Sequence, residues 1–275
     1  MTRIINKIDK KIFLEEKCFI PTMGALHEGH LSLVKLGKKS TNGKTIVSIF
    51  VNKRQFNDES DFDNYPIDLD KDIELLRKEE VDYIFIPQEN YIYPKDFEEL
   101  DGIKSGEKGS LFEGAHRPGH FDGVLTVVNR LFDLVNPTSV VFGKKDAQQL
   151  YLVKEFLANK SNNIKIIEAE IIRDEYGLAM SSRNRLLSTS GINIARNIFQ
   201  ILVNTKEHYI QNQDIQQSED FGKKLFNENA IEYDYLNFVD PKYFETPDSN
   251  REKLLLITAA YVQGIRLIDN MEVIQ

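Results

Sequence analysis

Short runs of apolar and β-branched residues recur through the first two thirds of the chain. The clearest is TIVSIFV at residues 45–51, which is almost continuously apolar. Such a run is typical of a strand that is covered on both faces, as in a parallel sheet. Similar runs occur at residues 18–20, 83–86, 139–142 and 164–167, and each of them predicts a further strand.

Between these runs the apolar residues follow a helical period. Residues 72–81 place Ile73, Leu75 and Leu76 together, and residues 124–135 carry an apolar stripe at the spacing of a core-facing helix. Strands that alternate with helices predict an α/β fold, a doubly wound, Rossmann-like domain with a parallel sheet. Such domains bind ligands at the carboxyl ends of their strands, so we expect the functional residues in the turns that follow the strands.

After about residue 174 this alternation stops. Residues 188–209 predict a helix, residues 221–226 another, and residues 233–239, 254–257 and 265–268 predict the strands of a small mixed sheet. The first helix should turn four side chains inward: Ile194, Ile198, Ile201 and Leu202. The sequence thus predicts a Rossmann-like domain over residues 1–174 and a smaller C-terminal α+β domain over residues 175–275.

Composition narrows the class of protein. The 275 residues are 41% hydrophobic, which suffices for a sizeable core, and the net charge is −8. An acidic chain of this kind argues against a general nucleic-acid binder, because such proteins carry basic surfaces. Cys18 is the single cysteine, which suits a reducing compartment, and no apolar run approaches the length of a membrane span. We therefore expect a soluble protein of the cytoplasm.

The segment PTMGALHEGH at residues 21–30 is the most informative stretch of chemistry. It follows a predicted strand, precedes a helical pattern, and places His27 and His30 three residues apart with Gly29 between them. A helix N-terminus is a natural seat for a phosphate, and two imidazoles there suit a phosphate that gains negative charge during a reaction. A structural, hydrogen-bonded histidine pair is the alternative. A zinc-protease motif is excluded because it needs its second histidine at i+4.

Other turns offer polar groups in similar positions. Gly143 to Asp146 follows a predicted strand and opens a helix on which Gln149 lies, so it is a second phosphate-binding turn or a solvated charged turn. Met180 to Arg183 combines two hydroxyls with a guanidinium. Gln55 follows a third strand and is placed to orient a small polar ligand, or simply to form a turn.

Three further segments resemble known loops or motifs. The glycine-rich residues 101–119 are either a mobile loop over the site or a plain surface connection. Residues 37–45 end in GKT but join a helix to a strand, the reverse of a P-loop. The acidic residues 58–72 lack the glycine of an EF-hand, so we interpret them as a solvated face that could contribute one carboxylate to magnesium.

Seven segments taken together resemble the pantothenate synthetase (pantoate–beta-alanine ligase) family. They are PTMGALHEGHLSLV, IFVNKRQF, NYP, RPGHFDGVLTVV, FGKKDAQQL, GLAMSSRN and RLIDN, and they spread in the family's order over nearly the whole chain. The first segment alone resembles only the wider nucleotidyltransferase superfamily with its HxGH signature.

The resemblance implies an ATP-dependent ligation in two steps. The carboxylate of pantoate attacks the α-phosphate of ATP and releases pyrophosphate, and the amine of beta-alanine then attacks the pantoyl-adenylate and releases AMP and pantothenate. The resemblance also implies magnesium as the companion of ATP and a homodimer as the assembly.

Roles for individual residues follow from the same resemblance. It makes His30 the catalytic histidine, and His27, Lys145 and Arg183 supply further positive or hydrogen-bonding groups. Gln55 would touch pantoate and beta-alanine, and Gln149 would hold pantoate. ATP would contact Met23, Gly24, Ala25, Leu26, His27, Glu28, Gly29, His30, Gly143, Lys144, Lys145, Asp146, Ile172, Met180, Ser181, Ser182 and Arg183.

The chain departs from the family's pattern at several positions. Lys53 stands where the family has proline, Ile67 where it has arginine, and Lys144 where it has glutamate, which would add a cation beside the phosphates. Asp72 is the best-matched carboxylate for magnesium, although a neighbouring acidic position is Lys71 here. The competing functions are another HxGH nucleotidyltransferase, a tRNA-synthetase relative, and a non-catalytic nucleotide-binding protein.

Overall fold

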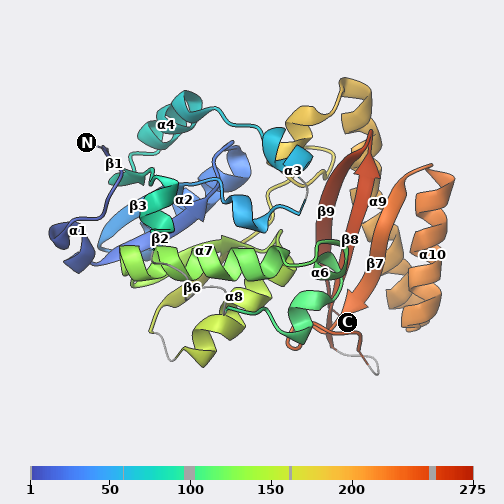
Figure 1. Cartoon of the computed structure of the whole chain (residues 1–275). Helices are drawn as coiled ribbons and strands as arrows, with labels where there is room; N and C mark the ends of the chain where they lie inside the picture. Colours follow the sequence, from blue (N-terminus) through green and yellow to red (C-terminus); the bar gives the residue numbers. More distant parts are fainter. Residues whose placement is uncertain (1, 58, 96–102, 161–162, 248–251, 275) are drawn as a thin grey trace.

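The protein is described by a computed structural model that covers residues 2–57, 59–95, 103–160, 163–247 and 252–274 (Figure 1). Six parallel strands form its larger sheet, in the order β1-β4-β3-β2-β5-β6. Their bounds are β1 (Arg3–Ile5), β2 (Lys17–Thr22), β3 (Lys44–Ile49), β4 (Tyr83–Phe85), β5 (Ser139–Gly143) and β6 (Lys165–Ala169). The predicted α/β fold with a parallel sheet is confirmed.

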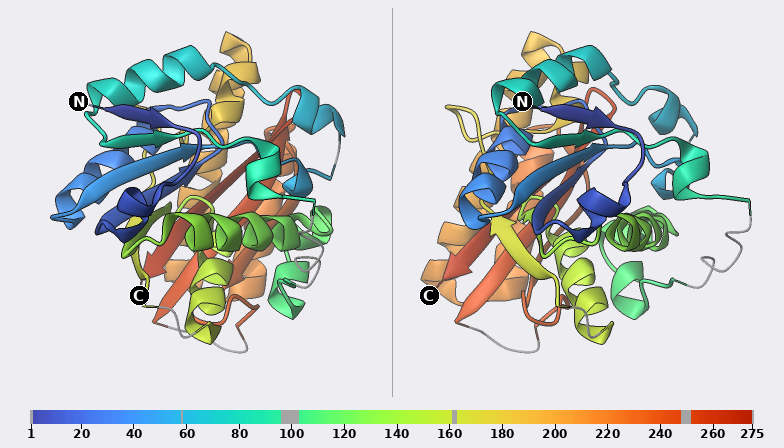
Figure 2. Two further views of the ribbon diagram at one scale, coloured as in Figure 1. Left: turned by 60° about the vertical axis from the view of Figure 1, so that its left-hand side comes forward. Right: turned by 90° about the vertical axis from the view of Figure 1, so that its left-hand side faces the viewer.

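Helices cover both faces of this sheet, as the continuous apolar runs predict. On β2, Phe19 points to one face, and Cys18 and Ile20 point to the other. The Phe19 face packs against α1 (Lys10–Leu14), α7 (His120–Val135) and α8 (Ala147–Asn159). The opposite face packs against α2 (Glu28–Ser40) and α4 (Leu69–Lys78), and Figure 2 shows the sheet between the two layers.

Several short elements connect these layers. They are η1 (Lys53–Gln55), α3 (Glu59–Asp63), α5 (Glu89–Ile92), η3 (Glu107–Ser110), α6 (Glu113–His116) and η4 (Ser182–Leu186). Two of them, η3 and α6, lie in the segment 101–119 that the sequence predicted as a loop. Residues 101 and 102 lie outside the described residues, and the remainder packs against the C-terminal part of the chain through contacts given below.

The C-terminal sheet consists of β7 (Glu232–Val239), β8 (Lys253–Val262) and β9 (Ile265–Ile274). All its pairings are antiparallel, so the prediction of a mixed sheet was wrong; β8 and β9 are joined by a two-residue turn, which reverses the chain. The helices α9 (Thr189–Asn212) and α10 (Ile215–Glu228) cover one face. Ile194 is 40% exposed and does not point inward as predicted, because Ala195, Ile198 and Leu202 form the buried stripe of α9.

The other face of this sheet packs against the larger sheet's layer of helices. Alternate residues of β7 and β8, among them Val239 and Ile257, form a buried cluster that Phe112 and Tyr151 join from the N-terminal part. The middle of β9 lies beside the turn that follows β5, because Asn270 bonds to the carbonyls of Lys144 and Lys145. In the part of the chain that the structure describes, no helix is long and apolar enough to cross a membrane.

Candidate active site

The order in which successive strands are added to the larger sheet reverses between β2 and β5. The strands β2 and β5 are neighbours, but β3 and β4 follow on one side while β6 follows on the other. In a parallel sheet this switch point leaves a crevice at the carboxyl ends of the two strands. The turns at residues 23–27 and 143–146 both open into this place, as the sequence predicted.

The turn after β2 has an unusual backbone that a buried carboxylate holds. Gly24 has φ +84° and Ala25 has φ +52°, and a Cβ added to Gly24 would lie 2.9 Å from Oδ2 of Asp72. The backbone N–H groups of Ala25 and Leu26 donate to the two oxygens of Asp72, each at 2.7 Å. The helix α4 thus fixes the start of α2 through one side chain.

Asp72, which the sequence suggests as a magnesium ligand, is engaged with the backbone of the turn, and its role toward magnesium stays a prediction. Its side chain is 1% exposed, and each of its oxygens already accepts a backbone hydrogen bond. Burial raises the pKa of this carboxyl, against the effect of these two bonds. Among the described residues no group of three or more His, Cys, Asp or Glu side chains could hold a metal ion.

The two histidines cap α2 with defined tautomers. The N–H of Gly29 donates to Nδ1 of His27 at 3.1 Å, and the N–H of His27 lies 3.4 Å from Nδ1 of His30. Because Nδ1 accepts in both rings, Nε2 carries the proton in the neutral form. The ring centroids are 4.1 Å apart, so the two Nε2–H donors belong to one compact group.

Both imidazoles are neutral near pH 7. Burial lowers the pKa of His27 to about 3, with further effects of His30, Lys145 and Arg185. Burial likewise lowers the pKa of His30 to about 4, with Asp146 acting in the opposite direction. The histidines can therefore act as hydrogen-bond donors without carrying a positive charge, and the cations that line the cavities here are Lys145, Arg183 and Arg117.

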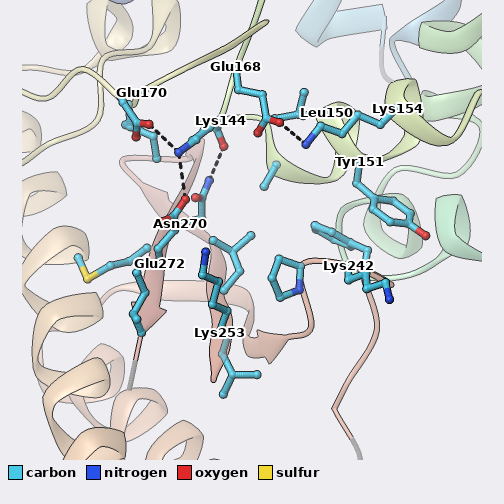
Figure 3. Close-up of a pocket in the computed structure, with 18 of the residues that line it drawn as sticks. Lys144, Leu150, Tyr151, Lys154, Glu168, Glu170, Lys242, Lys253, Asn270 and Glu272 are labelled. Atoms are coloured by element: carbon cyan, nitrogen blue, oxygen red, sulfur yellow. Dashed lines mark hydrogen bonds and ion pairs between the residues drawn. The ribbon is translucent and has the colours of Figure 1, made fainter. Parts of the chain in front are cut away.

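The second turn separates its two lysines. Nζ of Lys145 lies 3.2 Å from Asp146 Oδ1, and both residues line the crevice. Nζ of Lys144 instead contacts Glu170 at 2.6 Å and Glu272 at 3.1 Å, on the far side of the turn (Figure 3). The side chain of Lys144 lines a different cavity, and a second cation beside the phosphates stays a prediction for this residue.

The Met180–Arg183 segment completes the crevice and is tied to the first turn. Ser182 Oγ donates to the carbonyl of Ala25 at 2.9 Å, and Arg185 donates to the carbonyl of Leu26. The N–H of Met180 bonds to the carbonyl of Ile172 at 2.9 Å. Residues 25–26 and 180–185, which are far apart in the sequence, therefore hold each other in place, and Ile172 supports the second segment.

Two adjoining cavities, of about 170 and 200 Å³, occupy the crevice. They share seven lining residues: Met23, His30, Leu33, Tyr65, Gly143, Asp146 and Arg183. His27, Gly29, Lys145, Ile172, Met180, Ser181 and Ser182 line the smaller cavity as well. Glu28 is exposed and lines neither cavity, and Gly24, Ala25 and Leu26 contribute through the turn's backbone.

The two predicted glutamines both line the larger cavity. Gln55 is 8% exposed; its Nε2 lies 3.0 Å from the sulfur of Met23, and its Oε1 accepts from Asn52 at 3.2 Å. Gln149 enters from the first turn of α8. Its neighbour Gln148 points away from this cavity and bonds to backbone groups of residues 108–113. Of the two adjacent amides, Gln149 thus lines the cavity and Gln148 supports the segment 108–113.

Sequence reasoning missed several residues of the site. Nδ1 of His120 donates to the carbonyl of Gln55 at 2.7 Å, and Nε2 accepts from Arg117 at 3.2 Å. Both residues, with Tyr65, line the larger cavity. A sequence signal for these site residues lies in the segments NYP and RPGH, where polar residues adjoin proline or glycine. Those two segments entered the sequence analysis only as part of the family resemblance.

The fold and the crevice define a nucleotide-binding α/β protein of the Rossmann-like class. Residues 2–272 match the family described as pantoate-beta-alanine ligase, and the chain belongs to this family. Among curated proteins, it is 41% identical to a pantothenate synthetase of Caldicellulosiruptor bescii, over 98% of the chain and 96% of the relative. It is 38% identical to that of Thermosipho africanus, over 97% and 96% respectively.

Solved structures agree with the sequence relatives. A pantothenate synthetase from Thermus thermophilus superimposes with a TM-score of 0.92 at 34% identity and covers 100% of both chains. A pantoate-beta-alanine ligase from Francisella tularensis, complexed with beta-gamma ATP and beta-alanine, gives 0.78 at 32% identity, over 98% of this chain and 97% of the other. The activity of this family is ATP-dependent ligation of pantoate and beta-alanine.

Proposed function

We propose that the crevice adenylates pantoate and then transfers the pantoyl group to beta-alanine, with the residues below in specific roles. The observation that supports this is the convergence of His27, His30, Lys145 and Arg183 on one cavity that continues into the cavity lined by Gln55 and Gln149. A triphosphate fits the first set of groups, and a small hydroxy acid fits the second.

In the first step, a carboxylate oxygen of pantoate forms a bond to the α-phosphorus while the bond to pyrophosphate breaks. Negative charge grows on the phosphate oxygens, so donors fixed in advance stabilise the transition state more than the ground state. We assign His30, with His27, to the α-phosphate through their Nε2–H groups. Lys145 and Arg183 would offset the charge of the phosphate chain from the two other segments.

In the second step, the amine of beta-alanine attacks the acyl carbon of the adenylate and AMP leaves. Gln55 would contact both acids and Gln149 would hold pantoate, as hydrogen-bonding groups without charge. The remaining predicted contacts to ATP would come from the residues of the two turns and of the Met180–Arg183 segment that line the smaller cavity. An adenylate is easily hydrolysed, so we further propose that residues 103–119 help to exclude water from it.

Magnesium, in this proposal, arrives with ATP. The described residues offer no protein cluster for it, and magnesium commonly binds through substrate phosphates and water with few carboxylates. The phosphates of ATP and water would then hold the ion in the crevice.

The proposal extends to organisation and location. We propose residues 1–174 and 175–275 as the two domains, since separate buried clusters form on each side of this boundary. A homodimer follows from the resemblance alone, and the single buried Cys18 is compatible with a reducing cytoplasm.

Pantoate-dependent exchange of labelled pyrophosphate into ATP tests the first step. We expect exchange with ATP, magnesium and pantoate in the absence of beta-alanine, and a loss of roughly 10²–10³-fold in His30→Ala, as for one transition-state donor. Circular dichroism of the variant serves as the folding control. No exchange at saturating pantoate would exclude the ligase mechanism, and it would favour a non-catalytic nucleotide-binding protein.

A further inference from the structure

The segment RLIDN, at residues 266–270, lies outside the two cavities of the crevice but contacts the elements that build it. It forms the start of β9 and carries an arginine, an aspartate and an asparagine that are all engaged with distant parts of the chain. The asparagine is the one that reaches a catalytic turn.

Asn270 binds the turn that carries Lys145. Its Nδ2 donates to the carbonyl of Lys144 at 3.0 Å and to the carbonyl of Lys145 at 2.9 Å. Figure 3 shows the first of these bonds, with the side chain of Lys144 directed away toward Glu170 and Glu272. The amide nitrogen of asparagine carries two hydrogens, so it can donate one to each of the two successive carbonyls.

Asn270 is itself held firmly. Its side chain is buried, with the residue 4% exposed. Its N–H donates to Asp269 Oδ1 at 2.7 Å, and its carbonyl accepts from Nη2 of Arg173 at 2.9 Å. Arg173 and Asp269 also form a two-bond ion pair with each other, at 2.6 and 2.9 Å. The backbone of Asn270 therefore has little freedom to move.

The rest of the turn is fixed from the larger sheet. The N–H of Lys144 bonds to the carbonyl of Ala169, at the end of β6, at 2.9 Å. The turn thus has one anchor on β6 and two on Asn270. Removing the second set would leave Lys145 between the bond of Lys144 to Ala169 and the start of α8, where the N–H of Leu150 bonds to the carbonyl of Asp146, with its own carbonyl no longer fixed by Asn270.

We propose that Asn270 is a positioning residue for the ligase reaction, which sets Lys145 in the crevice by fixing the two carbonyls of its turn from the C-terminal sheet. This inference rests on the proposed role of Lys145 at the phosphates. It assigns a function to β9 that reaches the reaction without contact between Asn270 and substrate. Small displacements of a catalytic group carry large rate losses, so such an anchor matters.

Asn270→Asp is the most direct test because it preserves size and replaces the donating nitrogen by an oxygen that faces two carbonyls. We expect the maximal rate of pantoate-dependent pyrophosphate exchange to fall by about 10- to 100-fold. The KM for pantoate should stay within about twofold, because the glutamine side of the cavity is untouched. Asn270→Ala should give a loss in the same direction.

Glu272→Gln is the matched control on the same strand. It removes the negative charge from the exposed pair of Glu272 with Lys144 Nζ but leaves both carbonyl bonds in place. Its exchange rate should remain close to that of the unmodified protein. Thermal unfolding of all variants shows whether any loss of exchange comes from loss of the fold.

A double-mutant cycle shows whether Asn270 acts by positioning Lys145 or by supporting the fold in general. In a Lys145→Ala background, Asn270→Asp should cost less than about threefold, because residues that act through one another are not additive. Equal costs in both backgrounds, or full exchange in Asn270→Asp, would overturn the positioning role while leaving the ligase function intact. Absence of exchange in the unmodified protein would overturn both.

Discussion

At the scale of single residues, the histidines of this site act through their tautomers. His27 and His30 accept at Nδ1, which leaves Nε2–H as the donor, whereas His120 donates from Nδ1 to the carbonyl of Gln55. Burial, followed by the nearby Arg117 charge, lowers the pKa of His120 to about 4 from 6.5. All three rings are therefore neutral at pH 7, and their protonation in acid should weaken the hydrogen bonds that their nitrogens accept.

His120 gives a pH prediction with a definite sign. Its pKa in the folded state lies below that of the unfolded chain, so its contribution to stability is complete above about pH 6.5 and is lost as the pH falls toward 4. His120→Asn keeps a donor for Gln55 and does not titrate. Between pH 7 and 4.5, the unmodified protein should lose about 1–3 kcal/mol more unfolding free energy than the variant does.

Urea unfolding at several pH values measures this difference. The variant should be somewhat less stable at pH 7, because it lacks the contact with Arg117. Parallel pH profiles for the two proteins would show that His120 does not titrate in this range.

At the scale of elements, α4 positions a turn that belongs to β2 and α2. Helices usually cover a sheet by apolar contacts, and α4 does so with Leu76. It adds one buried carboxylate, which holds a backbone whose positive φ angles at Gly24 and Ala25 are costly without support. The conformation of the turn is therefore held by a residue that lines neither cavity of the crevice.

Asp72→Asn should weaken both the fold and the reaction. One of the two accepting oxygens becomes a donor that faces an N–H group, so we expect about 2–3 kcal/mol of destabilisation from the loss of a charged hydrogen bond. Exchange of pyrophosphate should fall because the start of α2 shifts. Asp68→Asn is the control; Asp68 caps α4 from an exposed position, and asparagine caps equally well.

Chemical denaturation and the exchange assay together decide this case. A stable Asp72→Asn variant without exchange would instead indicate that the carboxylate acts directly in the reaction.

At the scale of the whole molecule, one buried charge network joins the segment 103–119 to the C-terminal sheet. Glu113 accepts from Nη1 of Arg266 at 2.7 and 2.8 Å and lies 3.3 Å from Arg117, and Arg266 also bonds to Asp234 at 2.7 Å. Although burial would raise the pKa of Glu113, Arg266 and Arg117 lower it overall. The network thereby connects β9 to the arginine beside Gln55.

Glu113→Gln should release this segment. Breaking a buried ion pair by removing one partner is costly, and since Asp234 remains with Arg266 we expect about 2–4 kcal/mol. The KM for pantoate should rise as Arg117 loses its support. Lys108→Met, which removes a partly exposed pair with Glu245, should cost less than about 1 kcal/mol.

Limited proteolysis between residues 103 and 119 reports on the segment directly. Faster cleavage in Glu113→Gln than in Lys108→Met is the expected result. Equal cleavage of the two variants would show that the buried pair does not hold the segment.

Much of this arrangement could be predicted from local sequence, and the remainder could not for a physical reason. Apolar runs with turns after them predicted β2, β5 and the positions of His30 and Lys145, because strand and turn signals are local. The opposite directions of Lys144 and Lys145, and the carboxylate of Asp72 beneath the turn, depend on partners that lie far away in the chain. Such pairings have no sequence period to reveal them.

The pairing of Cys18 on β2 with Ser139 on β5 has a consequence for how the protein is made. The crevice forms at this junction, so the intervening chain must be closed into a loop before the two turns can meet. Such closure is slow compared with the formation of local helices, and parallel sheets with distant partners fold late. A chain emerging from the ribosome would build its helices early and acquire the crevice only after synthesis has passed β5, with β9 adding the final contacts. Variants that slow this closure should lower the yield of folded protein more than its specific activity.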